Sequence, residues 1–369
     1  MASKLGKKGH SPDYVILSLI FILVIFGLVM LASASSELGK KNFNDTYYYI
    51  KHQLLYGLSF GILGFFLASK LYYRYYQKFA VVLLLLSLGA LVLVFTSFGH
   101  TAGGAGRWLK LGPIIFQPAE LLKLTYIIYL AAWLSNSRKG REGNFFEGFM
   151  PFLIITGLIG GLLVLQPATS TVVILVSAGL GTYFLSGAKL KFIALVGLLG
   201  IAGFALLIYL TPYRLARIEV FFNRDQDIEG NGHQINEALI TLGSGGLWGS
   251  GYGQSTSKFG RLPASVNDSI FAVIGSELGF VGAGTLVVLF AFLSLRILWL
   301  AKDFRDHFGQ LVLVGFAIII GLQAFVNMAA ISGLLPLTGI PLPFISFGGT
   351  ALAVFLTMGG IINNISKHS

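Results

Sequence analysis

The sequence predicts an all-α polytopic membrane protein with about ten transmembrane helices and one large extracytoplasmic loop between spans 7 and 8. Of its 369 residues, 55% are hydrophobic and 11% charged, whereas an ordinary soluble domain has about 25% charged residues. Apolar stretches of about 17 to 25 residues recur, and each can cross about 30 Å of hydrocarbon as a helix. The predicted spans are approximately 13–34, 51–69, 78–97, 117–134, 149–165, 169–187, 190–210, 269–299, 309–331 and 347–365.

We expect a single transmembrane domain over residues 1–369, because every connection is short except residues 211–269. With the N-terminal tail, residues 1–12, inside the cell, the cytoplasmic segments carry fifteen Lys and Arg residues against five in the short outer loops. Cytoplasmic loops retain basic residues during insertion. Both termini are therefore predicted to be cytoplasmic, and the long loop to lie outside. The net charge of +11 follows this topology, and no clustered basic domain indicates nucleic-acid binding.

The first apolar run is predicted to be a retained span. Ala32-Ser33-Ala34 could be read as a signal-peptidase site, but the run exceeds the 7 to 15 residues of a signal-peptide core. The chain has no cysteine, which excludes disulfides, thiolate metal sites and a thiol nucleophile.

The fourth span begins with two opposite charges. Glu120 and Lys123 are three residues apart, on one helical face, and are expected to form an ion pair. Pro118 fits the first helical position, and Glu120 complements the helix dipole. The pair either neutralises itself and fixes helix packing or organises a polar cavity open to the outer face. Gln117 either orients polar groups of a site or caps the helix.

The long loop is expected to lie over the bilayer surface and present cations to an anionic lipid head group. It carries five basic residues, Arg214, Arg217, Arg224, Lys258 and Arg261. Segments 215–222 and 234–242 are amphipathic enough for short interfacial helices, and a glycine-dense segment follows at 243–253.

Asp268 stands where the loop meets the eighth span. An Asp there is a common helix N-cap, but a carboxylate at a water–lipid boundary can also have its pKa raised enough to act as a general base. Glu277 follows nine residues later, about 900° around a helix. We therefore interpret Glu277 as a buried structural carboxylate and not as a catalytic partner of Asp268.

No metal site is predicted. Asp225-Gln226-Asp227 resembles a metal-binding D-x-D, but a calcium loop would need its acidic twelfth residue at Asn236, so solvated loop acids are the better interpretation. The six histidines are scattered without ligand spacing.

Several blocks, in order along nearly the whole chain, resemble the SEDS family of bacterial cell-wall polymerases, which includes FtsW, RodA and SpoVE. The blocks are Gly106-Arg107-Trp108-Leu109, Leu111-Gly112-Pro113, 116–123, Tyr213-Arg214-Leu215 with Arg217-Ile218, 243–247, Asp268 with 270–274, 333–336 and 339–349. The Leu-Gly-Pro and Phe-Gln-Pro-Ala-Glu-Leu segments are closer to FtsW than to RodA.

This resemblance implies a peptidoglycan glycosyltransferase that polymerises lipid II at the outer face of the bacterial cytoplasmic membrane. It implies that Asp268 is the essential aspartate and that Glu120 and Lys123 are the family's buried pair. Asp268 would accept the proton of the acceptor sugar's 4-hydroxyl as that oxygen displaces undecaprenyl pyrophosphate from the growing strand with inversion. The leaving group departs as an anion, so no second carboxylic acid is needed.

The remaining site residues would bind substrate. Lys123, Arg107, Arg214 and Arg217 are candidates for stabilising the pyrophosphate, with Lys258 and Gln117 as further substrate contacts. A divalent cation, Mg²⁺ or Mn²⁺, could assist, although no ligand cluster demands one. The expected partners are the lipid substrates and a class B penicillin-binding protein transpeptidase.

Three positions depart from the family pattern. The usual acid after Gln-Pro is Ala168, the usual Thr before the aspartate is Asn267, and the usual Glu-Glu pair is Ser276-Glu277. Two alternatives to the polymerase stay open: a lipid II flippase, and a non-catalytic scaffold for the transpeptidase.

Overall fold

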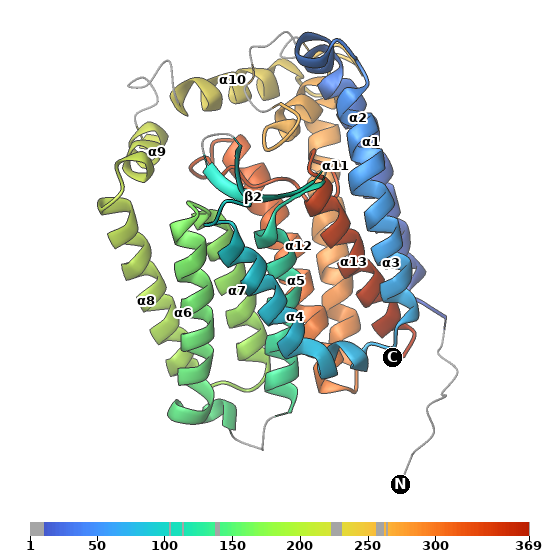
Figure 1. The fold of residues 1–369 in the computed structure, drawn as a ribbon. Helices are drawn as coiled ribbons and strands as arrows, with labels where there is room; N and C mark the ends of the chain where they lie inside the picture. The colour runs from blue at the N-terminus through green and yellow to red at the C-terminus, as the bar shows by residue number, and fades with distance from the viewer. Residues whose placement is uncertain are drawn as a thin grey trace.

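The structure is a computed structural model that describes residues 11–102, 105–112, 114–136, 141–222, 231–255, 262 and 265–368. The chain is a helical bundle with one small sheet (Figure 1). Its elements are α1 (Tyr14–Phe43), α2 (Tyr48–His52), η1 (Gln53–Leu58), α3 (Ser59–Lys70), α4 (Arg74–Leu93), β1 (Gly99–Ala102), β2 (Ala105–Leu111), β3 (Ile114–Phe116), α5 (Pro118–Ser135), η2 (Arg141–Gly143), η3 (Phe145–Phe149), α6 (Met150–Leu165), α7 (Thr169–Leu185), α8 (Leu190–Tyr209), α9 (Pro212–Phe222), α10 (Asn231–Ser244), α11 (Ile270–Asp303), α12 (His307–Ile331) and α13 (Gly349–Ser366).

Each of the ten predicted spans corresponds to a helix. Within the described part of the chain, eight helical segments are long and apolar enough to cross a membrane, with α2, η1 and α3 forming one of them. Helix α7 is apolar but shorter, and α5 carries the Glu120 and Lys123 charges. The polytopic helical fold is therefore confirmed, and the membrane crossing of α5 and α7 stays a prediction.

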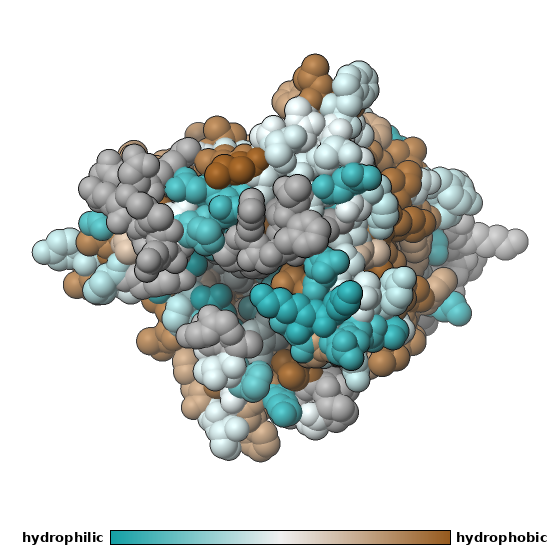
Figure 2. Space-filling model, turned by 90° about the horizontal axis from the view of Figure 1, so that it is seen from above, coloured by the Kyte–Doolittle hydropathy of each residue, from teal (hydrophilic) through white to brown (hydrophobic). Residues whose placement is uncertain are grey.

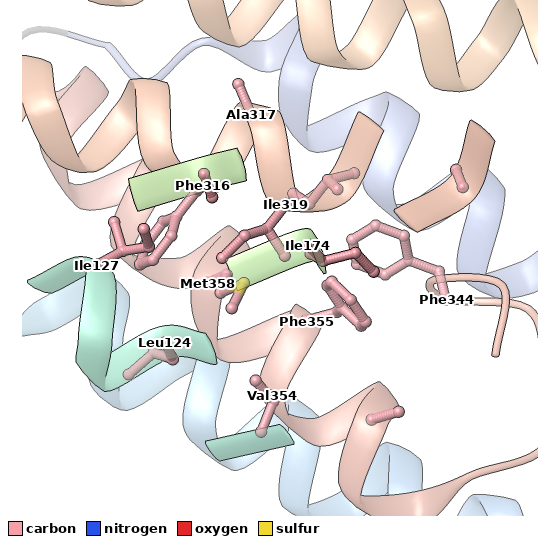
Figure 3. Packing of buried hydrophobic residues seen from close by; sticks show 14 of the residues in the cluster. Leu124, Ile127, Ile174, Phe316, Ala317, Ile319, Phe344, Val354, Phe355 and Met358 are labelled. Atoms are coloured by element: carbon pink, nitrogen blue, oxygen red, sulfur yellow. The ribbon is translucent and has the colours of Figure 1, made fainter. Parts of the chain in front are cut away.

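The centre of the bundle is formed by α12 and α13. About 72% of the most apolar window of α12 and 78% of that of α13 is buried, against 11% for α8. Phe316 and Ile319 of α12 lie among Phe355 and Met358 of α13 (Figure 3). Because α8 has little protein around it, its apolar surface suits contact with lipid.

Small residues bring α3 and α13 close together. A Cβ on Gly360 of α13 would collide with the carbonyl oxygen of Phe65, and one on Gly61 of α3 would collide with the Leu356 side chain. Glycine at a helix interface lets the two backbones approach. Asn364 adds polar contacts, since its Oδ1 accepts from the Tyr73 N–H at 2.9 Å and its Nδ2 donates to Ser69 O at 2.8 Å.

The connection between α4 and α5 forms a small three-stranded antiparallel sheet, which the sequence analysis did not predict. Strand β2 is central: Leu109 faces Gly99 of β1 and Phe116 of β3. The sheet lies toward the end of the bundle that also carries α9 and α10 (Figure 1).

The start of α1 and the end of α13 meet at the opposite end of the bundle. The Asp13 N–H donates to Ser366 Oγ at 3.2 Å, and Arg296 of α11 pairs with Asp13 at 2.8 Å. Helices α9 and α10 match the two short helices predicted in the long loop. Seen from their end, the molecule gathers hydrophilic side chains toward the middle of the face (Figure 2).

Helix α11 is broken at Gly279, whose φ of 69° and ψ of −170° are not helical. The glycine-dense segment fills the break: Phe280 N–H donates to Gly246 O at 2.8 Å and Val281 N–H to Leu247 O at 3.1 Å. In return, the N–H groups of 250 and 251 donate to the carbonyl oxygens of 276 and 277, at 3.0 and 3.1 Å. The glycine-dense segment thereby supplies hydrogen-bond partners for four backbone groups at the break, where a helix in a membrane protein would otherwise leave them unpaired.

Candidate functional site

Asp268 lies just before α11 and does not cap it. The N-cap residue is Ser269, whose side chain makes no capping hydrogen bond. The simple explanation of Asp268 as a helix cap is therefore wrong. The residue is partly exposed, and its carboxylate is available for another role.

The surroundings of Asp268 favour its neutral form. Burial raises the pKa of the Asp268 carboxyl above its ordinary value, while its own N–H, the Arg217 charge and the Gln234 side chain oppose that rise. Arg217 comes from α9 and Gln234 from α10. The two helices of the long loop thus act on the carboxylate, whose raised pKa suits a general base.

The segment from 335 to 347 forms the other wall of the site. A Cβ on Gly339 would lie 3.7 Å from Asp268 Oδ2, in van der Waals contact. Arg217 Nη1 donates to Leu337 O at 3.1 Å. The Phe347 N–H donates to Val266 O at 2.9 Å, and Ser346 Oγ donates to the Asn267 carbonyl.

A small open pocket borders this wall. Its lining consists of Arg217, Val220 and Phe221 of α9, Ile235 of α10, and the segment 335–337. Apart from the guanidinium, the lining side chains are apolar. This lining therefore sets one cation, Arg217, among apolar side chains.

Glu120 and Lys123 form the predicted ion pair. Lys123 Nζ lies 2.7 Å from Glu120 Oε2, and the two side chains are 1% and 4% exposed. Lys123 Nζ also donates to Gln323 Oε1 at 2.7 Å and lies 5.1 Å from the centre of the Phe355 ring. The pair is enclosed by protein, which favours the alternative in which it neutralises itself and fixes helix packing.

Two of the predicted arginines hold the turn between α6 and α7. Arg107 donates to the carbonyl oxygens of Gln166, at 3.0 Å, and of Pro167. Arg214 donates to Thr169 Oγ1 at 3.0 Å, to Thr211 Oγ1 at 2.8 Å and to Val164 O at 3.4 Å. Both guanidinium groups are therefore oriented by this turn, where the chain has Ala168 in place of the usual acid.

Of the two other predicted substrate contacts, Gln117 and Lys258, the structure describes only Gln117. Gln117 occupies the N-cap position of α5, but its side chain makes no capping bond, and its N–H donates to Thr350 Oγ1 at 3.2 Å. The capping interpretation of the Gln117 amide was therefore wrong. Lys258, like Arg224, Arg261 and the Asp225-Gln226-Asp227 motif, lies outside the described residues.

Glu277 is confirmed as a buried carboxylate in the helix packing. It is 1% exposed, and both of its oxygens lie 2.7 Å from Ser33 Oγ of α1. Its neighbour Ser276 contacts Ser244 Oγ at 3.1 Å. Ser276 and Glu277 therefore join α11 to α10 and α1.

Among the described residues, no group of three or more His, Asp or Glu side chains is placed to hold a metal ion. The role of a divalent cation stays a prediction.

The sequence interpretation missed two amides on α12. Gln323 and Asn327 are 0% and 1% exposed. Asn327 Nδ2 donates to Asp268 O at 2.8 Å and to Ile340 O at 2.7 Å, while Gln323 contacts Lys123 and Pro341. Polar side chains four residues apart in an apolar span were the available signal.

The sequence matches the FTSW_RODA_SPOVE family, described as "Cell cycle protein", over residues 14–369. It is 37% identical over 357 residues to a probable peptidoglycan glycosyltransferase FtsW of Geobacter sp. (strain M18), covering 96% of this chain and 97% of the relative. It is 34% identical over 363 residues to the stage V sporulation protein E of Bacillus subtilis (strain 168), covering 98% and 99%.

Two solved structures share the fold over 96% of this chain. One belongs to a peptidoglycan synthase complex that coordinates polymerization and crosslinking, with a TM-score of 0.78, 26% identity and 97% of that chain covered. The other is the rod shape determining protein RodA of Thermus thermophilus, with a TM-score of 0.69, 28% identity and 96% covered. With its helical bundle and its match from residue 14 to the C-terminus, the chain belongs to the FtsW/RodA/SpoVE family of multi-pass membrane proteins.

Proposed function

We propose that the protein is a peptidoglycan glycosyltransferase that polymerises lipid II, with Asp268 as the general base. The observation that carries the proposal is the carboxyl group of Asp268, a partly exposed residue, whose pKa is raised by burial and which is acted on by Arg217, a residue of the adjoining pocket. The relatives named as probable peptidoglycan glycosyltransferases support the reaction class.

Asp268 takes the proton from the 4-hydroxyl of the acceptor sugar while that oxygen forms a bond to the anomeric carbon of the growing strand. The bond from the anomeric carbon to undecaprenyl pyrophosphate breaks, and the electron pair leaves with the pyrophosphate. Because the leaving group is already a stable anion, the site needs cations on that side and no second acid. Arg217 is the nearest candidate, since it both lines the pocket and acts on Asp268.

Arg107, Arg214 and Lys258 complete the proposed substrate contacts. Hydrogen bonds to the α6–α7 turn orient the guanidinium groups of Arg107 and Arg214. A divalent cation, Mg²⁺ or Mn²⁺, would add positive charge at the pyrophosphate. Glu120 and Lys123 belong to the proposed site as a buried pair that supports it from within the bundle.

The proposed setting is the bacterial cytoplasmic membrane, with Asp268 outside and both termini inside. The proximity of Asp13 to Ser366 supports having the two termini on one side, and the excess of basic residues in the predicted cytoplasmic segments supports the direction. We include a class B penicillin-binding protein as partner, because one structural relative comes from a complex that also crosslinks.

The test is polymerisation of purified lipid II by the purified full chain, followed as glycan length on a gel, with EDTA, Mg²⁺ and Mn²⁺ as separate arms. Asp268→Asn should lower the rate by about 10²–10⁴, the usual contribution of a general base. Asp45→Asn is the matched control, because Asp45 lies in an exposed pair with Lys51. Lipid II translocation without polymer would favour a flippase, and growth of cells carrying Asp268→Ala would favour a scaffold.

A further inference from the structure

Gln323 and Asn327 form a polar strip inside an apolar helix. They are four residues apart on α12, and so lie on one face. Both are fully enclosed by protein, at 0% and 1% exposure. Buried amides are stable only when their hydrogen bonds are made, so the partners of these two side chains define what they do.

The partners connect two distant parts of the site. Gln323 Oε1 accepts from Lys123 Nζ at 2.7 Å, and Gln323 Nε2 donates to Pro341 O at 2.9 Å. Asn327 Nδ2 donates both of its hydrogens, to Ile340 O at 2.7 Å and to Asp268 O at 2.8 Å. A continuous series of contacts thus runs from the Glu120–Lys123 pair, through α12, to the backbone of Asp268.

We infer that Gln323 and Asn327 are positioning residues through which the buried ion pair sets the direction of the Asp268 carboxylate. The inference rests on the proposed function of Asp268. Asn327 Nδ2 binds the carbonyl oxygens of both Asp268 and Ile340, and Gly339, next to Ile340, lies so near that a Cβ built on it would be 3.7 Å from Asp268 Oδ2. Holding these two backbone segments together therefore fixes Asp268 relative to the wall formed by residues 335–347.

Lys123 acts in this arrangement without touching substrate. Its side chain is 1% exposed and is occupied by Glu120 and Gln323. A charged donor on Gln323 Oε1 polarises that amide and strengthens the bond that its N–H group makes to Pro341. The chemistry requires a carboxamide at 323, because glutamate cannot donate and lysine cannot accept.

Stability alone does not account for Asn327. Its Oδ1 is buried and accepts no hydrogen bond from the described residues. An unsatisfied buried acceptor costs about 1–3 kcal/mol, so an apolar side chain would fit a purely structural position better. The two N–H groups of Asn327, which donate to Asp268 O and Ile340 O, are the reason to keep an amide at this position.

The experiment measures lipid II polymerisation by the purified full chain carrying Asn327→Leu, with Asn363→Leu as the matched control. Asn363 is also a buried amide, with Nδ2 bonded to Ser69 Oγ and Oδ1 without a partner among the described residues, but it lies on α13 near the opposite end. Asn327→Leu should lower kcat by about 10²-fold, as expected for a misplaced catalytic group, with KM unchanged. Asn363→Leu should keep kcat. Equal kcat values for both variants would overturn the inference.

A double-mutant cycle tests the connection to the ion pair. Because Lys123→Met alone leaves Glu120 as an unpaired buried charge, the cycle uses the Glu120→Gln/Lys123→Met variant as its background. If Lys123 acts through Gln323, adding Gln323→Met to this background should lower kcat no further. Effects that multiply would overturn the connection. Asn327→Ser, which keeps one donor and should retain part of kcat, replaces Asn327→Leu if the latter does not fold.

Hydrogen exchange separates this inference from the proposed function. Asn327→Leu should speed amide exchange in residues 336–347, and Asn363→Leu should not. If the unchanged protein forms no polymer, the proposed function fails, and exchange alone then decides whether Asn327 holds the segment. Unchanged exchange in 336–347 would refute the positioning role.

Discussion

Replacing Lys123 by methionine should destabilise the fold severely, because it leaves the buried Glu120 carboxylate without its oppositely charged partner. The two side chains are 1% and 4% exposed, and their charged atoms are 2.7 Å apart. Removing one member of a buried ion pair costs about 3–5 kcal/mol, since the remaining charge has neither water nor a partner. Methionine has nearly the same length, so the lost packing is small.

Two further variants isolate the charge effect. Glu120→Gln with Lys123→Met removes both charges, and should recover most of the loss, because replacing a whole buried pair is close to neutral. Lys51→Met removes one member of an exposed pair, Lys51–Asp45, whose side chains are 65% and 34% exposed. That change should cost about 0–1 kcal/mol.

The assay is the free energy of unfolding in mixed micelles, measured by titration with denaturing detergent at neutral pH. We expect the free energy of unfolding to decrease in the order unchanged protein, Lys51→Met, double variant and Lys123→Met. A Lys123→Met protein as stable as Lys51→Met would refute the reasoning. So would a double variant no more stable than the single one, because either result would mean that Glu120 finds water or another partner.

The structure predicts the direction of three other effects, on stability, on pH dependence and on folding. Asp268→Asn should be the slower enzyme yet more stable than the unchanged protein at pH 7. A carboxyl group whose folded pKa lies above its unfolded pKa contributes less stability as pH rises between the two values, and an amide has no such loss. A thermal unfolding series from pH 4 to 8 checks this, and equal stability at every pH would contradict it. Arg217→Gln removes a charge that lowers the pKa of Asp268, so the acid limb of the kcat–pH profile should move to higher pH, and an unmoved limb would exclude electrostatic action of Arg217 on the base. Gly279→Ala should impair folding, because the φ of 69° disfavours any side chain and the new Cβ would collide with the Gly249 backbone. Gly284→Ala, on the same helix with open space around it, is the control. Expression level and thermal stability are measured for both variants, and equal values would refute this account.

The sequence was sufficient to locate the helices because long apolar runs have few alternatives in a membrane protein. It located the ends less well. The run predicted for 13–34 continues as α1 to Phe43, since residues 35–43 contain no proline and helices can extend beyond the hydrocarbon. The break at Gly279 was not predictable, because its hydrogen-bond partners come from residues 246–251, about thirty positions earlier in the chain.

In the candidate site too, local features were predicted from the sequence and features formed by distant segments were not. The Glu120–Lys123 pair is local and follows from helical spacing, so it was predicted correctly. Arg107 and Arg214 were recognised as cations, but their shared turn at 164–169 depends on three separate elements meeting in space. The sheet was missed because β2 carries no clear alternation of apolar and polar residues, and its strands are stabilised by pairing with each other.

Asp268 is held by parts of the chain that differ in how firmly they are fixed. From below, Asn327 of the central helix α12 binds its backbone carbonyl. From above, Arg217 and Gln234 of α9 and α10 act on its carboxylate, and these helices belong to the loop outside the bundle core. The backbone of the base is thereby fixed by buried amides, while its acidity depends on residues of the surface loop. Substrate that displaces Arg217 toward a pyrophosphate would remove a charge that lowers the pKa of Asp268, and so make the carboxylate a stronger base at the moment the acceptor hydroxyl must lose its proton.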